Sequence, residues 1–202
     1  MGKKSTNEND RARKMVAQEA ARIIVNQGIR DYRAAKMKAA ERLGLSTRGS
    51  LPRNSEIECA IEEHHKLFGG DSHVNFLRSM RESALAAMEL LSLFTPRLVG
   101  PVLSGTADEN SAVNLHVFAD DAEAVALQLN SMDIPYRPYE RRLKSRRDHS
   151  DTFAGFEFRH AMAAIQATVF PIDGIRQAPL SPIDGRPMER ADMTRVKGLI
   201  EV

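Results

Sequence analysis

Two segments of the 202-residue chain carry polar side chains at a spacing that could bind a charged ligand. In the extended segment 113–118 (VNLHVF), Asn114 and His116 are two residues apart, so both point to the same face of a strand. The segment 137–147 (RPYERRLKSRR) holds six Lys or Arg residues and a single Glu. Basic side chains pair with phosphates, and tyrosine rings stack on bases. The two segments therefore predict a site for a nucleotide or a nucleic acid.

The residues around the first segment resemble the start of the catalytic domain in the DNA polymerase beta-like nucleotidyltransferase superfamily. Segment 98–118 reads LVGPVLSGTADENSAVNLHVF. The family has a strand, a Gly-Ser that opens a helical turn, a loop, and a second strand that begins Ser-Asp-Ile-Asp-Leu. Its glycine lets the backbone approach a triphosphate, and its two aspartates, with a third carboxylate, hold two Mg²⁺ ions. The resemblance implies a nucleotidyltransferase-like fold that binds a nucleotide.

Several of the family's binding positions have a counterpart in this chain. Gly100 stands at the first glycine, although Pro101 replaces the small polar residue that follows it. Gly105 and Thr106 match the Gly-Thr-Ala of the loop, and Ser111 matches the Ser before the first aspartate. The nucleotide-binding residues that the resemblance implies are Gly100, Gly105, Thr106, Ser111 and Asn114. His116 is added to them because it follows Asn114 on the same strand face, and a hydrogen-bonded core or surface histidine is the alternative.

The metal-binding positions of the family are different here. Ala112 and Asn114 stand where the two aspartates would be, and the third position falls on Gln166 or Thr168. Because Mg²⁺ needs oxygen ligands that also neutralise its charge, these residues predict no metal cofactor. The alternative is a displaced Mg²⁺ site that uses the nearby carboxylates Asp108, Glu109 and Asp120. The spacing of the residues assigns no catalytic side chain.

Three functions remain open at this point. The first is binding of a nucleotide or RNA without transfer, by a protein that has lost the metal carboxylates. The second is an active metal-dependent nucleotidyltransferase with a displaced metal site. The third is a protein-interaction scaffold with a vestigial cleft, whose protein partner the sequence does not name.

The basic segment is expected to form a hairpin connection beside the sheet. Arg141, Arg142 and Arg146 are the expected contacts to phosphates or to a nucleic acid. An exposed charged hairpin that discourages edge association is the alternative. Segment 20–46 superficially resembles a repressor helix-turn-helix, but it holds few short polar side chains suited to base edges. A two-helix hairpin with a basic outer face is the favoured interpretation.

The periodicity of apolar residues predicts an α+β fold. Helical spacing and glycine breaks indicate four helices before Pro96, and extended segments follow at 97–103, 113–118, 134–140, 153–160 and 163–170. One helix is expected from Asp121 to about Met132, flanking a mixed sheet. The expected divisions are a disordered basic tail (1–12), a helical module (13–95), a nucleotidyltransferase-like domain (96–175) and a turn-rich tail with a short helix (176–202).

Composition narrows the class of protein. The net charge of +2 hides an asymmetry: residues 1–50 carry twelve Lys or Arg against five Asp or Glu, residues 51–135 five against thirteen, and residues 136–202 twelve against nine. Such asymmetry indicates a charged partner or mutually complementary segments. Cys59 is the one cysteine, which excludes a disulfide framework and a Cys-rich zinc site.

No part of the sequence indicates a membrane or secreted protein. No apolar run approaches the roughly 20 residues of a membrane span, and the first residues lack the apolar block of a secretory signal. We therefore expect a cytoplasmic protein without a membrane partner. The helical start and the tail APLSPIDGRP (178–187) also resemble those of bacterial proteins with a nucleotidyltransferase-like domain.

Overall fold

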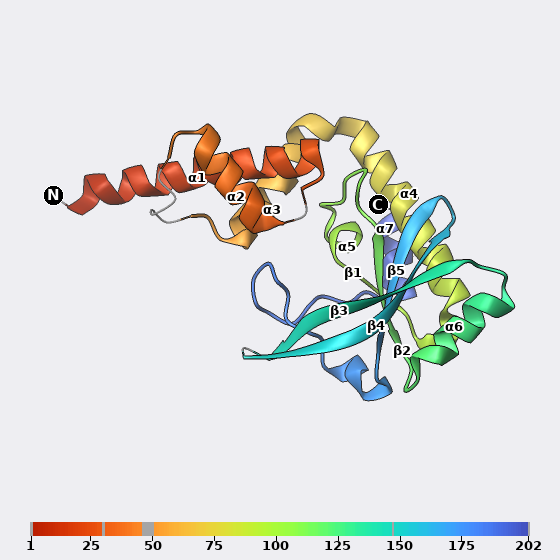
Figure 1. Ribbon diagram of the computed structural model, residues 1–202. Coiled ribbons are helices and arrows are strands. Elements are labelled where there is room, and N and C mark those ends of the chain that lie inside the picture. The colour runs from red at the N-terminus through yellow and green to blue at the C-terminus, as the bar shows by residue number, and fades with distance from the viewer. Residues whose placement is uncertain (1, 30, 46–50, 147, 202) are drawn as a thin grey trace. The chain divides into compact units, whose positions relative to one another are not determined.

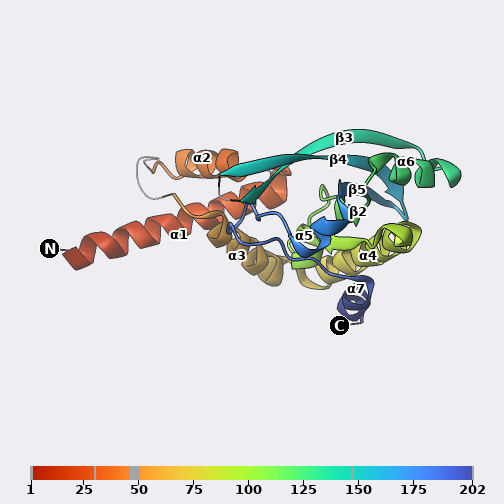
Figure 2. The same ribbon diagram turned by 90° about the horizontal axis from the view of Figure 1, so that it is seen from below.

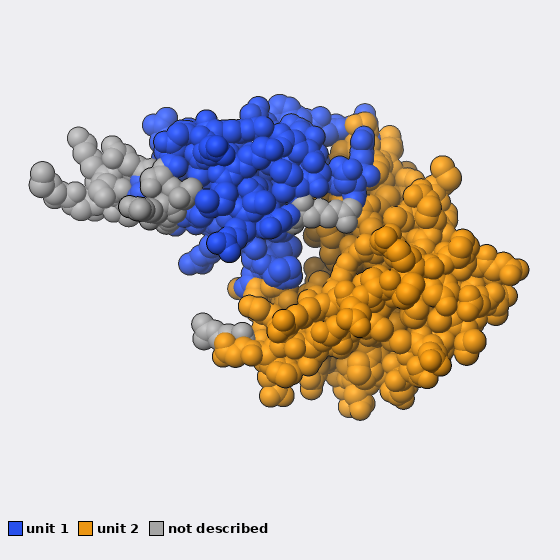
Figure 3. Space-filling view, in the orientation of Figure 1, with its two compact units in different colours: residues 1–71, 108–110, 182–184 blue, residues 72–107, 111–181, 185–202 orange. Residues whose placement is uncertain are grey.

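The computed structural model describes residues 2–29, 31–45, 51–146 and 148–201, and the side chains from residue 9 onward. Arg30, Arg147 and residues 46–50, in a stretch whose Gly, Ser and Pro content predicts a loop, lie outside the described residues. The chain combines helices with a five-stranded mixed sheet, which confirms the α+β class (Figure 1). It divides into two compact units, residues 1–71, 108–110 and 182–184, and residues 72–107, 111–181 and 185–202 (Figure 3).

The first unit is a group of three helices. It contains α1 (Gly2–Gln27), α2 (Tyr32–Arg42) and α3 (Asn54–His64), followed by a π-helical turn, η1 (His65–Gly69). Asp31 begins α2 because its carboxylate accepts hydrogen bonds from the Arg33 and Ala34 amides. Small and branched apolar side chains fill the core between the helices: Val16, Ala17, Ala20, Ala21, Ile23, Ala35, Ala39, Ile57, Ala60 and Ile61.

Two features of this unit differ from the sequence-based expectations. A helix begins at Gly2, where an irregular tail was expected over residues 1–12. Low apolar content does not oppose a helix, because Lys, Arg and Glu are good helix formers. Ser55 and Glu58 also have the spacing of a capping box in the sequence, but the box of α3 lies two residues earlier, since Glu56 Oε2 accepts from the Arg53 amide at 2.7 Å.

The second unit begins with the helix α4 and continues through the sheet. Its helices are α4 (Gly70–Leu90), of which the unit holds the part from Ser72, and α5 (Pro101–Ser104), α6 (Ala122–Ser131) and α7 (Met193–Ile200), with 3-10 turns η2 (Ser92–Phe94) and η3 (Ile172–Arg176). Its strands are β1 (Arg97–Val99), β2 (Val113–Phe118), β3 (Tyr136–Arg146), β4 (His149–His160) and β5 (Ala163–Phe170).

The sheet has the strand order β1-β2-β5-β4-β3, in which β2 and β5 are parallel and the other neighbours are antiparallel. Side chains alternate between its two faces. One face is apolar and packs against α4, α6 and α7, and Figure 2 shows α4 and α7 on the same side of the sheet. Buried residues of that packing include Met88, Leu91, Leu98, Leu115, Leu129, Phe156, Phe158, Ile165 and Val196.

Packing on this face explains why the unit boundary falls in the first turn of α4, at Ser72, and not after the helix. The helical module was expected to extend to residue 95, but Ala84, Ala87 and Met88 of α4 are fully buried in the sheet's core. The helix therefore belongs to the sheet that it covers. The segment expected as a turn-rich tail contributes residues 182–184 to the first unit and residues 176–181 and 185–202, with α7, to the second.

The strands also differ in length from their expected ranges. The first extended segment is short, because Gly100 has a φ of 73° and the one-turn helix α5 follows it directly. The basic segment is not a connecting loop: Arg141, Arg142 and Arg146 all lie in β3, which pairs with β4 along its length. None of the helices in the described ranges is long and apolar enough to span a membrane.

Candidate functional site

The face of the sheet opposite the helices is polar. Asn114 of β2 pairs with Gln166 of β5, and Gln166 in turn pairs with Glu157 of β4. Residues that are paired across neighbouring strands point to the same face. Three polar side chains therefore lie in one row across the middle of the sheet. His116 and Thr168 form the next row on the same face.

Arg141 of β3 is held at the centre of this face by two amide oxygens. Its Nη1 donates to Asn114 Oδ1 at 3.1 Å, and its Nη2 donates to Gln166 Oε1 at 2.6 Å. Both amides are themselves oriented, since Asn114 Nδ2 donates to the Ala112 carbonyl at 3.1 Å and Gln166 Nε2 donates to Glu157 Oε2 at 3.1 Å. The network fixes the guanidinium and leaves its positive charge unneutralised.

The Tyr139 ring lies next to the Arg141 guanidinium and helps to hold it in position. Its hydroxyl shares a hydrogen bond of 2.8 Å with the hydroxyl of Thr168, which is fully buried. Its ring lies over Gly155, where a β-carbon would come within 2.6 Å of the ring atom Cε2. The Arg141 guanidinium lies 5.4 Å from the centroid of the same ring, within the range of a cation–π interaction. Burial raises the pKa of the Tyr139 hydroxyl, so the ring is neutral at pH 7.

A second guanidinium, that of Arg190, reaches the same face from the C-terminal segment. Ala191 forms an isolated bridge with Leu98 on the apolar side of β1, so the preceding residue falls on the polar side. Arg190 Nε donates to His116 Nδ1 at 3.0 Å, and Nη1 donates to the Gly174 and Ile175 carbonyls at 2.8 and 3.2 Å. Its Nη2 is buried and has no hydrogen-bond partner among the described residues.

The His116 imidazole is neutral because of its surroundings. It is 1% exposed and packs against the Phe170 ring at 4.4 Å between centroids. Burial, and then the charges of Arg190 and Arg141, lower the pKa of His116 to about 3. The histidine therefore accepts a hydrogen bond from Arg190 and adds no charge to the face at neutral pH.

Arg97 is a further guanidinium of the face, since it pairs with His116 across β1 and β2. Burial, and then the nearby charge of Arg97, lower the pKa of Arg190 to about 10. Within the described part of the chain, none of the guanidinium groups of Arg97, Arg141 and Arg190 forms an ion pair with a carboxylate. Like charges have been gathered on one face, and an anion would relieve their repulsion.

The residues that the resemblance predicted as nucleotide-binding do not all lie together in the structure. Gly100 lies beside Asn114: a β-carbon on Gly100 would be 3.5 Å from Asn114 Nδ2. Gly105 and Thr106 lie at the other end of α5, where the Gly105 carbonyl is 3.3 Å from His73 Nε2 and Thr106 Oγ1 is 2.9 Å from Ser104 Oγ. Ser111 precedes β2 by two residues and is half-buried. The contacts thus join Gly100, Asn114 and Arg141, and they give Gly105 and Thr106 other neighbours.

The three predicted arginine contacts are also separated. Arg141 belongs to the polar face, and Arg142, the next residue of the strand, points to the opposite face and is exposed. Arg146 is exposed near the end of β3, beyond an irregularity in the pairing with β4. Only one of the three is in the hydrogen-bonded network.

Three residues of the site were not assigned a role from the sequence: Arg97, Glu157 and Arg190. Tyr139 and Gln166 were singled out for other roles, base stacking and the third metal position. The register of β4 against β5 would have found Glu157 and Gln166, because period-two alternation puts both on the Asn114 face. The alternation of apolar residues does not identify Arg190, because the bridge between Leu98 and Ala191 determines its position. Among the described residues, no group of three or more His, Cys, Asp or Glu side chains is arranged to hold a metal ion.

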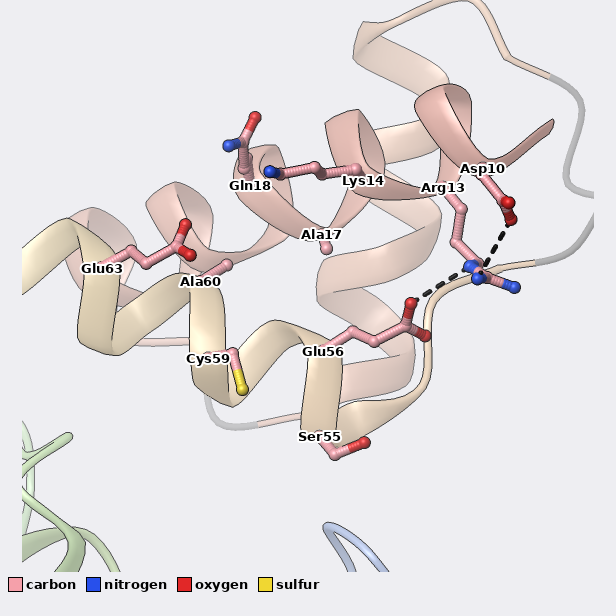
Figure 4. A pocket seen from close by; sticks show the side chains of 10 residues that line it. All are labelled: Asp10, Arg13, Lys14, Ala17, Gln18, Ser55, Glu56, Cys59, Ala60 and Glu63. Carbon is pink, nitrogen blue, oxygen red and sulfur yellow. Dashed lines mark ion pairs between the residues drawn. The ribbon is translucent and has the colours of Figure 1, made fainter. Parts of the chain in front are cut away.

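The helical unit has a groove of its own between α1 and α3 (Figure 4). Its volume is about 400 Å³, with Ala17 and Ala60 on its walls beside the thiol of Cys59. Arg13 closes one end through ion pairs to Asp10 at 3.2 Å and Glu56 at 3.1 Å. Arg13, Asp10 and Glu56 are thus already paired with one another, so this end of the groove indicates no ionic ligand.

Comparisons with known proteins pair this chain with none of them: no family model, no curated protein and no solved structure matches it.

Proposed function

We propose that the polar face of the sheet binds the phosphates of a nucleotide through guanidinium groups and without nucleotidyl transfer. One observation carries the proposal: the amide oxygens of Asn114 and Gln166 hold the Arg141 guanidinium at 3.1 and 2.6 Å. A guanidinium that is fixed and free of a carboxylate is suited to charge-assisted hydrogen bonds with phosphate.

Neutral amides, and not carboxylates, hold the Arg141 guanidinium. An aspartate at position 114 or a glutamate at position 166 would pair with Arg141 and cancel its charge. A neutral amide orients the same guanidinium and leaves the charge available for a ligand. In the family that the sequence resembles, carboxylates hold Mg²⁺ at this point of the sheet. In this chain the positive charge of the Arg141 guanidinium would stabilise the phosphates in place of the metal ions.

The other two guanidinium groups strengthen the same proposal. Arg190 is fixed by His116 and by two carbonyls, and one of its buried nitrogens has no protein acceptor within the described residues. Arg97 adds a charge close enough to lower the pKa of Arg190. Phosphate oxygens carry several lone pairs each and can accept from more than one guanidinium at once.

The absence of transfer is the second part of the proposal. Activation of an attacking oxygen in the resembled family needs two metal ions held by carboxylates. Ala112 is buried and offers no ligand, and both Asn114 and Gln166 are engaged with Arg141. His116 is neutral and hydrogen-bonded to Arg190, and the carboxylate of Glu157 pairs with Arg137 and accepts from Gln166.

Thermal shifts with ATP, CTP, GTP and UTP, each with Mg²⁺ and with EDTA, test the proposal. We expect stabilisation in EDTA by at least one nucleotide, and its loss in Arg141→Met. The matched control is Arg142→Met, which removes the same charge from the opposite face. A shift that needs Mg²⁺ would support a metal-dependent enzyme with a displaced site. No shift with any nucleotide would support the scaffold.

RNA is the second candidate ligand, because β3 also exposes Arg142, Lys144 and Arg146. Exposed cations on an extended strand can contact successive phosphates of a nucleic acid backbone. Such binding would weaken steeply with salt, as counterion release requires. Titration of a labelled single-stranded RNA at several salt concentrations distinguishes it: Arg142→Met should weaken RNA binding and leave nucleotide binding unchanged.

A further inference from the structure

A second hollow lies in the helical unit, at the start of α2 and α3. It has a volume of about 690 Å³, and small-molecule sites have volumes of about 300–1,000 Å³. Leu51, Pro52 and Pro182 line it with apolar surface, and Asn54 Nδ2 holds the Pro182 carbonyl at 2.8 Å. The hollow thus has an apolar lining that is tied to the first turn of α3.

Three cations line the same hollow. Arg33 and Lys36 come from the first half of α2, and Arg53 precedes α3. None of the three forms an ion pair with a carboxylate among the described residues. Burial lowers the pKa of the Lys36 amine, and the charge of Glu56 raises it by less. The hollow therefore holds one partly buried amine and two exposed guanidinium groups, none of which has a protein counter-ion within the described residues.

Two carboxylates stand near these cations, and both are already engaged. Asp31 lines the hollow, but its carboxylate accepts from the Arg33 and Ala34 amides at 2.8 and 3.3 Å as the cap of α2. Glu56 pairs with Arg13 at 3.1 Å and accepts from the Arg53 amide. Three cations against the one lining carboxylate leave a surplus of two positive charges.

We propose that this hollow binds a small phosphomonoester that carries an apolar or aromatic group. A phosphomonoester has a charge of about −1.5 to −2 at neutral pH, which the surplus of the lining would neutralise. The Arg33 and Arg53 guanidinium groups would receive the phosphate. The apolar surface of Leu51, Pro52 and Pro182 would cover the rest of the ligand. The inference concerns other residues than the polar face of the sheet and does not depend on nucleotide binding there.

The test is a ¹H–¹⁵N chemical-shift titration of the full chain with phenyl phosphate, inorganic phosphate and phenol. We expect saturable shifts with phenyl phosphate, centred on the amides of Tyr32, Lys36 and Asn54. Phenol lacks the charge and inorganic phosphate lacks the ring, so each should bind at least about tenfold more weakly. Equal affinity for phenyl phosphate and for either fragment would overturn the proposal.

Variants then assign the binding to the cations. The double variant Lys36→Gln/Arg53→Gln should weaken phenyl phosphate binding by at least about tenfold. Lys38→Gln is the control, because that amine lies on the same helix and donates to Gln27 at 2.8 Å. Arg141→Met should leave the shifts of the Tyr32, Lys36 and Asn54 amides unchanged, whatever it does to amides of the sheet. No saturable shift at these three amides, or a double variant that binds there like the wild type, would contradict the site.

Discussion

The side chains of the polar face form a chain of hydrogen bonds across four strands. It runs from Glu157 through Gln166 to Arg141 and Asn114, and it ends on the Ala112 carbonyl. Each member orients the next, so the loss of any one disturbs the position of the guanidinium. The site is therefore defined by a charged group and by the neutral groups that hold it.

Asn114→Asp tests whether the neutrality of the amide matters. The carboxylate can accept from Arg141 as the amide does, but it would cancel the guanidinium's charge. We expect nucleotide affinity to fall by at least about tenfold, or about 1.4 kcal/mol. Isothermal titration with ATP in EDTA measures the change. Asn130→Asp is the control, because it makes the same substitution at an exposed residue of α6. Unchanged affinity in Asn114→Asp would contradict the electrostatic role of the amide.

His116 makes the stability of the second unit depend on pH. Its pKa is about 3 in the folded chain and near the ordinary 6.5 in the unfolded chain. Between these values only the unfolded chain binds the proton, so this contribution leaves stability intact above pH 6.5 and lowers it as the pH falls. His116→Asn keeps an acceptor for Arg190 and removes the titration.

Urea unfolding at pH 7 and pH 5 measures this dependence. From pH 7 to pH 5, the wild type should lose about 2 kcal/mol more of its unfolding free energy than His116→Asn. Parallel losses in the two proteins would show that His116 does not carry the effect.

Among the elements, the β3–β4 hairpin determines where the site lies. The close approach of β3 to β4 at Gly155 lets the Tyr139 ring lie flat on the sheet beneath Arg141. A side chain on residue 155 would displace that ring and, with it, the support of the guanidinium. The glycine is required here for space, since the ring occupies the position of a β-carbon.

Gly155→Ala should therefore destabilise the chain by about 1–3 kcal/mol and weaken nucleotide binding. Gly198→Ala is the matched control: it lies in α7, where a β-carbon would meet no atom within 4 Å, and it should stabilise by about 0.5–1 kcal/mol. Chemical denaturation of both variants gives the comparison. A second variant, Gly155→Ala with Tyr139→Ala, should recover part of the loss, because the clash is removed. A destabilisation that persists in full would place the strain elsewhere.

The sequence predicted the elements of the second unit better than their ends. Alternation identified β2 and β5 at their observed bounds, because apolar residues on one face must meet the helices. The basic residues of β3 have no apolar alternation, so a connecting loop was expected where backbone pairing extends a strand. The resemblance singled out Asn114 and strand alternation added His116, whereas Arg190 depends on a bridge that tertiary structure makes. Local pattern cannot report such a contact.

In the molecule as a whole, each of the two units contains a local cluster of positively charged side chains. The helical unit gathers Arg33, Lys36 and Arg53 around a hollow, and the sheet gathers Arg97, Arg141 and Arg190 on its polar face. In both places the described carboxylates are engaged elsewhere. The net charge of +2 therefore conceals two local excesses of positive charge.

Magnesium should have opposite effects on the two main interpretations of the sheet. If Mg²⁺ is part of the site, the ion strengthens nucleotide binding. If guanidinium groups replace it, Mg²⁺ bound to the phosphates competes with them and reduces their attraction. Whether Mg²⁺ strengthens or weakens nucleotide binding to the intact protein therefore distinguishes a metal-dependent site from a guanidinium site.

Isothermal titration of the full chain with ATP, in EDTA and in Mg²⁺, is the most direct measurement of the central claim. We predict saturable binding in EDTA, equal or weaker binding in Mg²⁺, and loss of binding in Arg141→Met but not in Arg142→Met. Binding that requires Mg²⁺ would contradict the account, and so would binding that Arg141→Met leaves intact.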